Sequence, residues 1–269
     1  MKAKLLALAA VLTLALTGSA WAGSLTIKGS TTVLPIMQRA VEAYMKAHPD
    51  MKIDLSAGGS GEGIKALIDG TTDIAMASRE MKDKEIELAK SKGEDPKMII
   101  IARDAVCAIV NPNNPVQNLT VDQLQGIFSG KITDWKDVGG NPGRIAVISR
   151  DSSSGTFETW QEHVLKKEKV SPMALMQASS GAVMESVSKN KYAIAYDGLG
   201  YVTKDVKALK VNGVTPSEAT ARDGSYPVSR SLQIYVNGEP KGELKGFVDY
   251  LLSPAGQKDV KEAGYVTVK

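Results

Sequence analysis

The sequence predicts a protein of the α/β class, and three observations support this prediction. Short apolar runs typical of strands alternate with helical patterns along the chain after an apolar N-terminal segment. The 269 residues are 43% hydrophobic and 23% charged, which is ordinary for one large or two modest globular domains. No repeat, low-complexity tract or obvious linker interrupts the pattern.

The N-terminal segment differs from the rest of the chain. Two lysines precede an apolar run from Leu5 to Leu16, and "AWA" at 20–22 fits the small-x-small rule for cleavage. The run is shorter than the ~20 residues that a membrane span needs, which disfavours the alternative of an anchor. We therefore predict a signal peptide over residues 1–22 and export to a bacterial periplasm.

Seven apolar runs of strand length follow the predicted signal peptide. In chain order they are "SLTIKGS", "KIDLSAG", "DIAMAS", "MIIIARDAVCAIV", "RIAVISR", "YAIAYD" and "LQIYV". Helical patterns lie between them, and two more, "GELKGFVDYLLSPAG" and "QKDVKEAG", are predicted to close the chain.

For two helices, the sequence predicts where the helix begins and where it ends. The segment from Leu34 to Ala47 carries an apolar stripe at helical spacing, and His48-Pro49 follows it as a stop signal. Thr120 with Gln123 three residues later forms a capping box, and Gly130 is predicted to end that helix. The stripe consists of Met37, Ala40, Val41, Tyr44 and Met45.

The absence of a linker indicates that strands themselves carry the chain between two lobes. The run "IIIARDAVCAIVNP" is long enough for one crossing. Tyr226-Pro227, directly before "VSRSLQIYV", offers a second.

Charge and cysteine content exclude several classes of protein. Of the 33 basic residues, two lie in the predicted signal peptide, so 31 remain against 30 acidic ones. This balance lacks the basic excess typical of nucleic-acid-binding proteins. Cys107 is the only cysteine, so no internal disulfide supports the fold. The two histidines, His48 and His163, are not at ligand spacing, which argues against a metal site or a histidine-based triad.

One arrangement, a strand, a donor-rich turn and a helix, occurs three times. The turns are Gly29-Ser30-Thr31-Thr32, Gly58-Gly59-Ser60-Gly61, and Arg150 through Ser154-Gly155-Thr156. Each helix start offers free backbone N–H groups and the positive end of the helix dipole, and the hydroxyl groups add donors. Convergence of the three turns would form a cage for a small anion.

A capping role is the alternative for each turn, because Ser and Thr are preferred N-caps. A cap needs one side chain, yet the first turn supplies two threonines and the third supplies several hydroxyls and Arg150. The planar guanidinium of Arg150 suits bidentate binding of an oxyanion. The third turn is therefore predicted to bind an anion.

Three other motifs match known functional patterns only weakly. "GGSGEGIK" lacks the lysine directly after the second glycine, and the Ser or Thr that follows it, of a nucleotide-binding loop. Gly61-x-Gly63-x-x-Ala66 fits a relaxed dinucleotide fingerprint, but a tight strand-to-helix turn explains these glycines equally well. Ser186-x-x-Lys189 matches a serine–lysine hydrolase pattern that is frequent by chance on helix faces.

Five segments, taken together, resemble those of one known protein family. In order they are "GSTTVLPI", "GGSGEGI", "DIAMASR", "SRDSSSGTFE" and "AIAYDGLGY". From Gly23 to its last helix the chain resembles the periplasmic phosphate-binding proteins of phosphate ABC transporters. The resemblance implies a two-lobed, type II Venus-flytrap fold with a mixed sheet in each lobe and two chain crossings. It implies a first lobe of residues 23–103 plus 226–269 and a second lobe of residues 104–225.

The resemblance also implies inorganic phosphate as the ligand, bound between the lobes. Residues that match the family's contacts are Thr31, Thr32, Ser60, Arg150, Ser154, Gly155 and Thr156. These are positions that the three turns had already singled out.

One position departs from the family pattern. The best-known members carry an aspartate that accepts the proton of protonated phosphate where this chain has Ser78, followed by Arg79. A carboxylate at that place would repel a fully ionised oxyanion such as sulfate. Arg79 is expected either to contact the anion as well or to pair with an acid such as Glu80.

Two aspartates are candidates for the missing acceptor. Asp197 or Asp151 could supply it, and Asp151 could equally orient Arg150. Selectivity for phosphate over other oxyanions depends on which of these holds.

We expect binding without chemistry, in which the lobes close around the anion and then dock on the membrane permease. The protein is expected to be a monomer without cofactor, metal or nucleic-acid partner. The main alternative is a binding protein for another oxyanion, namely sulfate, molybdate or tungstate, which Ser78 favours. A secreted phosphohydrolase or serine hydrolase with Ser154 as nucleophile is less favoured, because no base and orienting group accompany that serine.

Overall fold

A computed structural model describes residues 23–166 and 168–268 of the chain. The predicted signal peptide, residues 1–22, lies outside the described residues. Within the described ranges, no helix is both long enough and apolar enough to cross a membrane.

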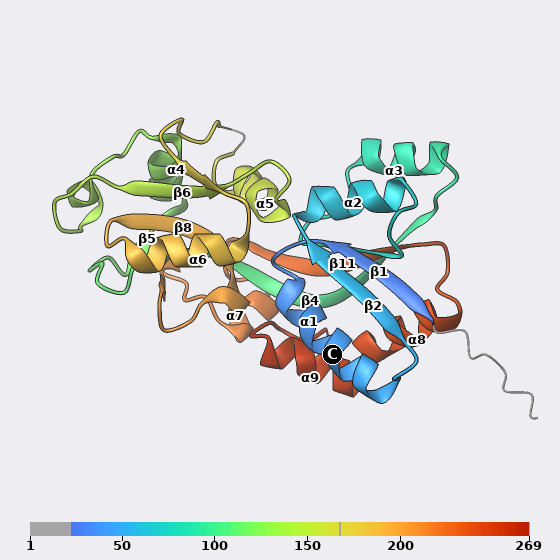
Figure 1. The fold of residues 1–269 in the computed structure, drawn as a ribbon. Coiled ribbons are helices and arrows are strands. Elements are labelled where there is room, and N and C mark those ends of the chain that lie inside the picture. The colour runs from blue at the N-terminus through green and yellow to red at the C-terminus, as the bar shows by residue number, and fades with distance from the viewer. Residues whose placement is uncertain (1–22, 167, 269) are drawn as a thin grey trace, which may run out of the picture.

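Two α/β lobes lie side by side and share their central strands (Figure 1). The first lobe contains β1 (Ser24–Gly29), α1 (Leu34–Ala47), β2 (Lys52–Ala57), α2 (Ser60–Ile68), β3 (Ile74–Ala77), α3 (Asp83–Ser91), α8 (Gly242–Leu252) and α9 (Pro254–Glu262). The second contains β5 (Asn118–Leu119), α4 (Val121–Ser129), η1 (Trp135–Val138), β6 (Ala146–Arg150), α5 (Gly155–His163), β7 (Leu175–Gln177), α6 (Ser180–Lys189), β8 (Ala193–Gly198), η2 (Leu199–Tyr201), β9 (Lys207–Ala208), β10 (Lys210–Val211) and α7 (Glu218–Arg222). Between them run β4 (Pro96–Val110) and β11 (Ser229–Asn237).

The long strand β4 joins the two halves of the sheet. Its first part pairs antiparallel with β11, and its last part, from Val106 to Val110, pairs antiparallel with β8. The strand order is β2-β1-β3-β11-β4-β8-β6-β7. Parallel pairs occur in each lobe, between β1 and its neighbours β2 and β3, and between β6 and its neighbours β7 and β8. The expected mixed sheet in each lobe and the crossing through β4 are therefore confirmed.

Helices cover both faces of the first-lobe sheet, with α2 and α3 on one side and α1, α8 and α9 on the other (Figure 1). Strand β3 contributes side chains to both faces of the sheet. Ile74 and Met76 pack in the cluster with α1, whereas Ala75 and Ala77 pack in the cluster with α2. This alternation follows from the two-residue period of a strand.

The two helices with predicted ends are confirmed. Helix α1 runs from Leu34 to Ala47 and buries its apolar stripe, apart from the half-buried Met45. Each large apolar side chain that is fully buried contributes about 1.5–3 kcal/mol. Thr120 and Gln123 form the capping box of α4, and Gly130 ends that helix with a φ of 83°.

The end of the chain returns to the junction of the lobes, which the sequence analysis did not anticipate. Val266 pairs with Arg103 of β4 through two backbone hydrogen bonds of 2.8 and 3.1 Å. Its side chain packs in the apolar cluster of the second lobe, whereas the neighbouring Tyr265 packs in that of the first lobe. A third segment thus ties the two lobes together.

Candidate functional site

The first donor-rich turn leads from β1 into α1. Gly29 has a φ of 136°, and a Cβ there would lie 2.2 Å from the carbonyl oxygen of Met76, so only glycine fits. This close approach to β3 directs the chain into α1 with Thr31 and Thr32 buried between the lobes. Tyr201 Oη of the second lobe donates to the carbonyl oxygen of Thr31 at 2.7 Å.

The second turn brings the two lobes into backbone contact. Gly59 has a φ of 132°, and a Cβ at this position would lie 2.7 Å from the carbonyl oxygen of Ser153. The backbone N–H of Gly61 donates to that oxygen at 2.9 Å, and Ser153 Oγ donates to the carbonyl oxygen of Gly58 at 3.0 Å. Ser60 begins α2 in this contact and is buried.

The third turn connects β6 to α5. Arg150 ends the strand, and Ser154 caps the helix by accepting a hydrogen bond of 3.2 Å from the backbone N–H of Phe157. Asp151 accepts from the backbone and hydroxyl of Ser153, which fixes the turn. Within the described residues, the hydrogen-bond partners of Asp151 belong to this turn, and none of them is Arg150.

The three turns converge, as the sequence predicted. Thr32 Oγ1 lies 2.8 Å from Thr156 Oγ1 of the other lobe, and Arg150 Nη2 donates to Thr31 Oγ1 at 3.1 Å. Ser60 Oγ lies 3.1 Å from Ser78 Oγ. A Cβ on Gly155 would lie 2.5 Å from Ser60 Oγ and 2.8 Å from Ser78 Oγ, so this helix start also touches the first lobe. We call the buried cluster of Thr31, Thr32, Ser60, Ser78, Arg150, Ser154, Gly155, Thr156 and Ser180 the cage.

Ser180, at the start of α6, joins the cage although the sequence analysis missed it. Its hydroxyl accepts from Arg150 Nη1 at 3.2 Å and lies 3.3 Å from Thr31 Oγ1. The backbone N–H of Ser180 also donates to Thr31 Oγ1 at 3.3 Å. The signal was present, because Ser179-Ser180-Gly181 repeats the pattern of a hydroxyl-rich turn before a helix. Four helix N-termini therefore meet at the cage.

The guanidinium of Arg79 pairs with carboxylates. It donates to both oxygens of Glu85 at 2.7 and 2.8 Å, and Nε lies 3.0 Å from Glu158 Oε1 of the second lobe. Glu80, the acid considered from sequence, contributes only its carbonyl oxygen. Lys82 also reaches Glu158, at 2.6 Å. We call Arg79, Lys82, Glu85 and Glu158 the clasp. Arg79, Lys82 and Glu158 line a groove of about 590 Å³ between the lobes.

The clasp shifts the ionisation of its members. Burial by itself would raise the pKa of Glu85, but hydrogen bonds from Arg79 and from the backbone of Lys82 outweigh it and lower that pKa. Burial would lower the pKa of Arg79, but the nearby Glu85 and Glu158 outweigh it and raise that pKa. Both groups are therefore charged at neutral pH.

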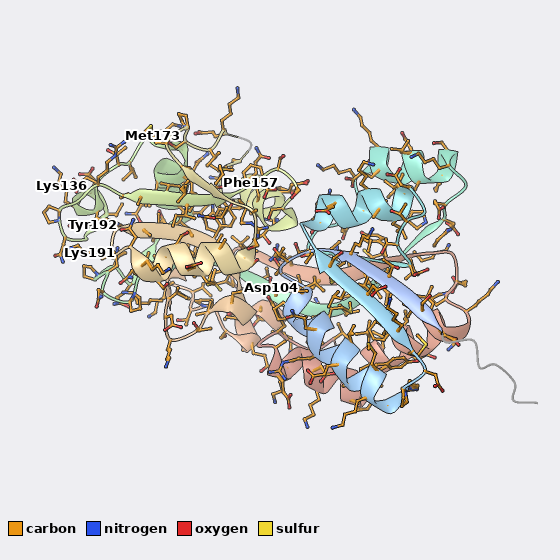
Figure 2. All side chains as sticks on the ribbon, viewed as in Figure 1. Asp104, Lys136, Phe157, Met173, Lys191 and Tyr192 are labelled. Carbon is orange, nitrogen blue, oxygen red and sulfur yellow. The ribbon has the colours of Figure 1, made fainter. Side chains whose placement is uncertain are left out.

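A third arginine, Arg230 of β11, was not part of the predicted site. It supports the cage from the central strands. Its Nε and Nη2 donate to Asp104 Oδ2 at 2.9 and 2.8 Å. Its Nη1 donates to Thr156 Oγ1 at 3.1 Å and to the carbonyl oxygen of Ser78 at 3.2 Å. Asp104 lies at the junction of the lobes in Figure 2. This pair thus connects the shared strands to one cage residue from each lobe.

Arg150 differs from both of these arginines in its partners. Its side chain is 1% exposed, and it donates to hydroxyl groups and to the carbonyl oxygens of Gln177 and Ala178. The nearest carboxylate, Asp197, lies 4.0 Å away, which is beyond hydrogen-bond length. The positive charge of Arg150 is thus surrounded mainly by neutral dipoles.

Asp197, at the end of β8, is fully buried. Its Oδ1 accepts from Ser180 Oγ at 3.0 Å and from the backbone N–H of Gly198 at 2.7 Å. Its Oδ2 has no hydrogen-bond partner among the residues that the structure describes. Burial raises the pKa of this carboxyl group, although Arg150 opposes the change.

The donor groups of the cage suit the binding of an anion. Hydroxyl groups and helix N-termini surround one buried guanidinium, and neither histidine lies among them, since His48 stacks on Tyr44 and His163 ends α5. In the parts of the chain that the structure describes, no group of three or more His, Cys, Asp or Glu residues could hold a metal ion.

Comparisons with known proteins agree with this geometry. Residues 16–255 match the family model of the PBP superfamily domain. The phosphate-binding protein PstS of Bacillus subtilis is 34% identical over 251 residues, which cover 91% of this chain and 81% of the relative. The protein of the same name from Staphylococcus epidermidis is 36% identical over 258 residues, which cover 91% of this chain and 78% of the relative.

Solved structures give the same result. A substrate-binding protein assigned to a phosphate ABC transporter of Clostridium perfringens, with bound phosphate, has a TM-score of 0.85 and 38% identity, covering 92% of this chain and 100% of that one. An ABC-type phosphate transport receptor from Vibrio cholerae has a TM-score of 0.74 and 34% identity, covering 90% of this chain and 99% of that one. The chain therefore belongs to the PBP superfamily and, within it, to the PstS family of phosphate-binding proteins.

Proposed function

We propose that this protein captures inorganic phosphate between its two lobes and delivers it to the membrane permease of a phosphate ABC transporter. The observation that carries the proposal is Arg150, a buried guanidinium whose hydrogen bonds all go to neutral oxygens in a cage of hydroxyl groups from both lobes. The relatives named as phosphate-binding proteins support the same ligand.

The proposed contacts follow from the cage. Phosphate would bind Thr31, Thr32, Ser60, Ser78, Arg150, Ser154, Gly155 and Thr156, with Ser180 added from α6. Arg79 is left out, because Glu85 and Glu158 already neutralise it. Charge-assisted hydrogen bonds contribute ~1.5–3 kcal/mol each, so about three to six of them reach the ~8 kcal/mol of micromolar binding before ordering costs.

Binding would close the protein. Hydrogen bonds between the lobes, such as that of Gly61 with Ser153, form only when the lobes meet, and the anion must favour that state. The closed lobes would then dock on the permease. We further propose lobe boundaries at residues 23–103 plus 226–269 and at 104–225, export through residues 1–22 to the periplasm, and a monomeric binding protein without enzymatic activity.

A receptor for another oxyanion is the second candidate. Ser78 favours it, since a hydroxyl group in place of a carboxylate can donate to sulfate as readily as to phosphate. The phosphohydrolase alternative has less support, because the hydroxyl group of Ser154 accepts from the backbone of α5 and no histidine lies in the cage.

Calorimetric titration of the mature protein tests the proposal. The protein is first unfolded and refolded without ligand, so that phosphate retained through purification is removed. We expect phosphate to bind at micromolar or lower concentration and p-nitrophenyl phosphate not to be hydrolysed. A refolded protein that binds sulfate or molybdate but not phosphate would instead establish the second candidate.

A further inference from the structure

We propose that a pocket in the second lobe, separate from the cage, binds a small organic anion that combines an apolar body with one carboxylate group. The pocket has a volume of about 420 Å³, within the range of ~300–1,000 Å³ that is typical of small-molecule sites. It lies where the end of α4 and the start of β6 meet the segments that precede β7 and β8. The inference concerns a second ligand and does not rest on the proposed function.

Apolar side chains form much of the wall of the pocket. They are those of Ile127, Ile132, Ile145, Val147 and Met173. Ile127 and Ile145 belong to the apolar core of the second lobe, whereas Met173 is 72% exposed. Tyr192, which also lines the pocket, is 36% exposed. A ligand with an apolar body would cover these two exposed side chains and remove their surface from water, which favours binding.

Arg144 brings a positive charge to the pocket. It stands two residues before β6, is exposed, and lines the cavity. Among the residues that the structure describes, no carboxylate pairs with its guanidinium. Asp134, which bridges to Arg144 through the backbone, uses its carboxylate to accept from the N–H groups of Lys136 and Gly143. A planar guanidinium without a protein partner suits a ligand carboxylate, which it binds through two parallel hydrogen bonds.

Two further polar residues of the pocket retain donors. Ser171 Oγ accepts from the backbone N–H of Met173 at 3.2 Å, and Asn190 Oδ1 accepts from the backbone N–H of Tyr192 at 3.0 Å. Both bonds use acceptor oxygens, so the hydroxyl proton of Ser171 and the amide hydrogens of Asn190 can donate to a ligand. A few polar groups in a mainly apolar wall fix the orientation of a ligand. Together with Arg144, these donors favour an anion.

The pocket and the cage lie at opposite ends of β6. Ala146, which begins the strand, lines the pocket, and Arg150, which ends it, belongs to the cage. The strand between them spans about 13 Å. Figure 2 shows Met173 and Tyr192 at the outer part of the second lobe, away from Asp104 at the junction of the lobes. Inorganic phosphate has no apolar body, so the walls of this pocket favour a different anion from the one proposed for the cage.

A solvated arginine beside a surface hollow is the competing explanation. The two explanations differ in which molecules they discriminate. A solvated guanidinium attracts every small carboxylate weakly and about equally, because water and salt screen its charge. A binding pocket requires both the carboxylate group and the apolar body.

Three probes separate these explanations when the mature protein is titrated and its backbone amides are followed by NMR. Indole-3-acetate has both features, acetate has the carboxylate alone, and indole-3-acetamide has the apolar body without the charge. Saturating phosphate is present throughout, so that the probes do not enter the cage. We expect indole-3-acetate to shift the amide signals of Ile145, Val147 and Tyr192 at sub-millimolar concentration. The other two probes should bind at least about tenfold more weakly.

A pair of variants tests the role of Arg144. Arg144→Met removes the charge and should weaken binding of indole-3-acetate by about tenfold, while binding of indole-3-acetamide stays unchanged. Lys136→Met is the matched control, because Lys136 is an exposed cation in the same outer part of the lobe and does not line the pocket. It should retain the wild-type affinity. Both positions are exposed, so neither change should disturb folding.

Two results would overturn the inference. One is that indole-3-acetate binds the wild-type protein no more tightly than acetate does, or shifts no amide signal of the pocket. The other is that Arg144→Met binds indole-3-acetate as tightly as Lys136→Met does. Neither result bears on phosphate binding at the cage, which the calorimetric titration of the proposed function tests separately.

Discussion

The cage and the clasp both join the lobes around a buried arginine, but they are built in opposite ways. In the cage, the side chain of Arg150 is 1% exposed, and hydroxyl and carbonyl oxygens are its hydrogen-bond partners. In the clasp, the side chain of Arg79 is 8% exposed, and Glu85 and Glu158 hold it at 2.7 and 3.0 Å.

This difference shows that burial of an arginine does not by itself mark an anion site. An anion at Arg79 would have to displace two carboxylates, whereas an anion at Arg150 adds a charge partner to a guanidinium that has none within hydrogen-bond length. The partners of each arginine therefore favour the cage over the clasp as the proposed anion site, and the clasp links the lobes through ion pairs.

Replacing Arg150 and Arg79 in turn is the strongest test of the difference between the cage and the clasp. We expect Arg150→Ala to weaken phosphate binding by at least about 2 kcal/mol, because charge-assisted bonds to the anion are lost. Arg79→Ala should weaken it by less than about 1 kcal/mol, as for a partly screened ion pair. Calorimetric titration of both variants measures the two losses, and equal losses would show that Arg79 also contacts the ligand.

A methyl group added at the cage should have the next largest effect on phosphate affinity. The Cβ of Gly155→Ala would lie 2.5 Å from Ser60 Oγ, so the lobes could not close fully, and phosphate affinity should fall by roughly tenfold or more. Gly181→Ala is the matched control in the first turn of α6, where the nearest atom is 4.0 Å from the added Cβ. It should retain phosphate affinity. Similar losses in the two variants would argue against close packing at Gly155.

Loss of the ion pairs of the clasp should have a smaller effect on phosphate binding. Glu158→Gln removes the carboxylate that Arg79 and Lys82 share across the lobes, so phosphate should dissociate several-fold faster, corresponding to about 1 kcal/mol or less. Stopped-flow release of phosphate measures this, and added salt should reduce the difference from wild type. Glu162→Gln, exposed on the same helix, is the control and should release phosphate at the wild-type rate.

Acid should remove the contribution of Glu85 to folding. Its pKa in the folded protein lies below the ordinary value of 4.5, so the ionised form stabilises the fold at neutral pH. That contribution is lost as the pH falls through the lowered pKa. Wild type should therefore melt at a higher temperature than Glu85→Gln at neutral pH, and the gap should close in acid. A gap that stays constant with pH would mean that Glu85 acts through packing alone.

Much of the fold could be read from local patterns. Helix α1 has the predicted ends at Leu34 and Ala47, because its apolar stripe and stop signal both lie within one short segment. The return of Val266 to β4 was missed, since a two-residue contact between distant parts of the chain leaves no periodic trace in the sequence.

The sequence by itself determined which segments offer donors to an anion. Thr31, Ser60 and Arg150 stand in turns whose glycines and hydroxyl groups have a local physical reason, namely tight strand-to-helix connections with free N–H groups. These features depend only on residues within a few positions of each other.

Only the tertiary structure decided the partners of the charged groups. Arg79 and Arg150 look alike in sequence, because each stands near the end of a strand: Arg150 is the last residue of β6, and Arg79 comes two residues after β3. Their roles diverge because Glu158 and Asp197 arrive from distant elements, at 3.0 and 4.0 Å respectively. The energy of a buried charge depends on such distances, which the folded arrangement of the lobes sets and which spacing along the chain does not reveal.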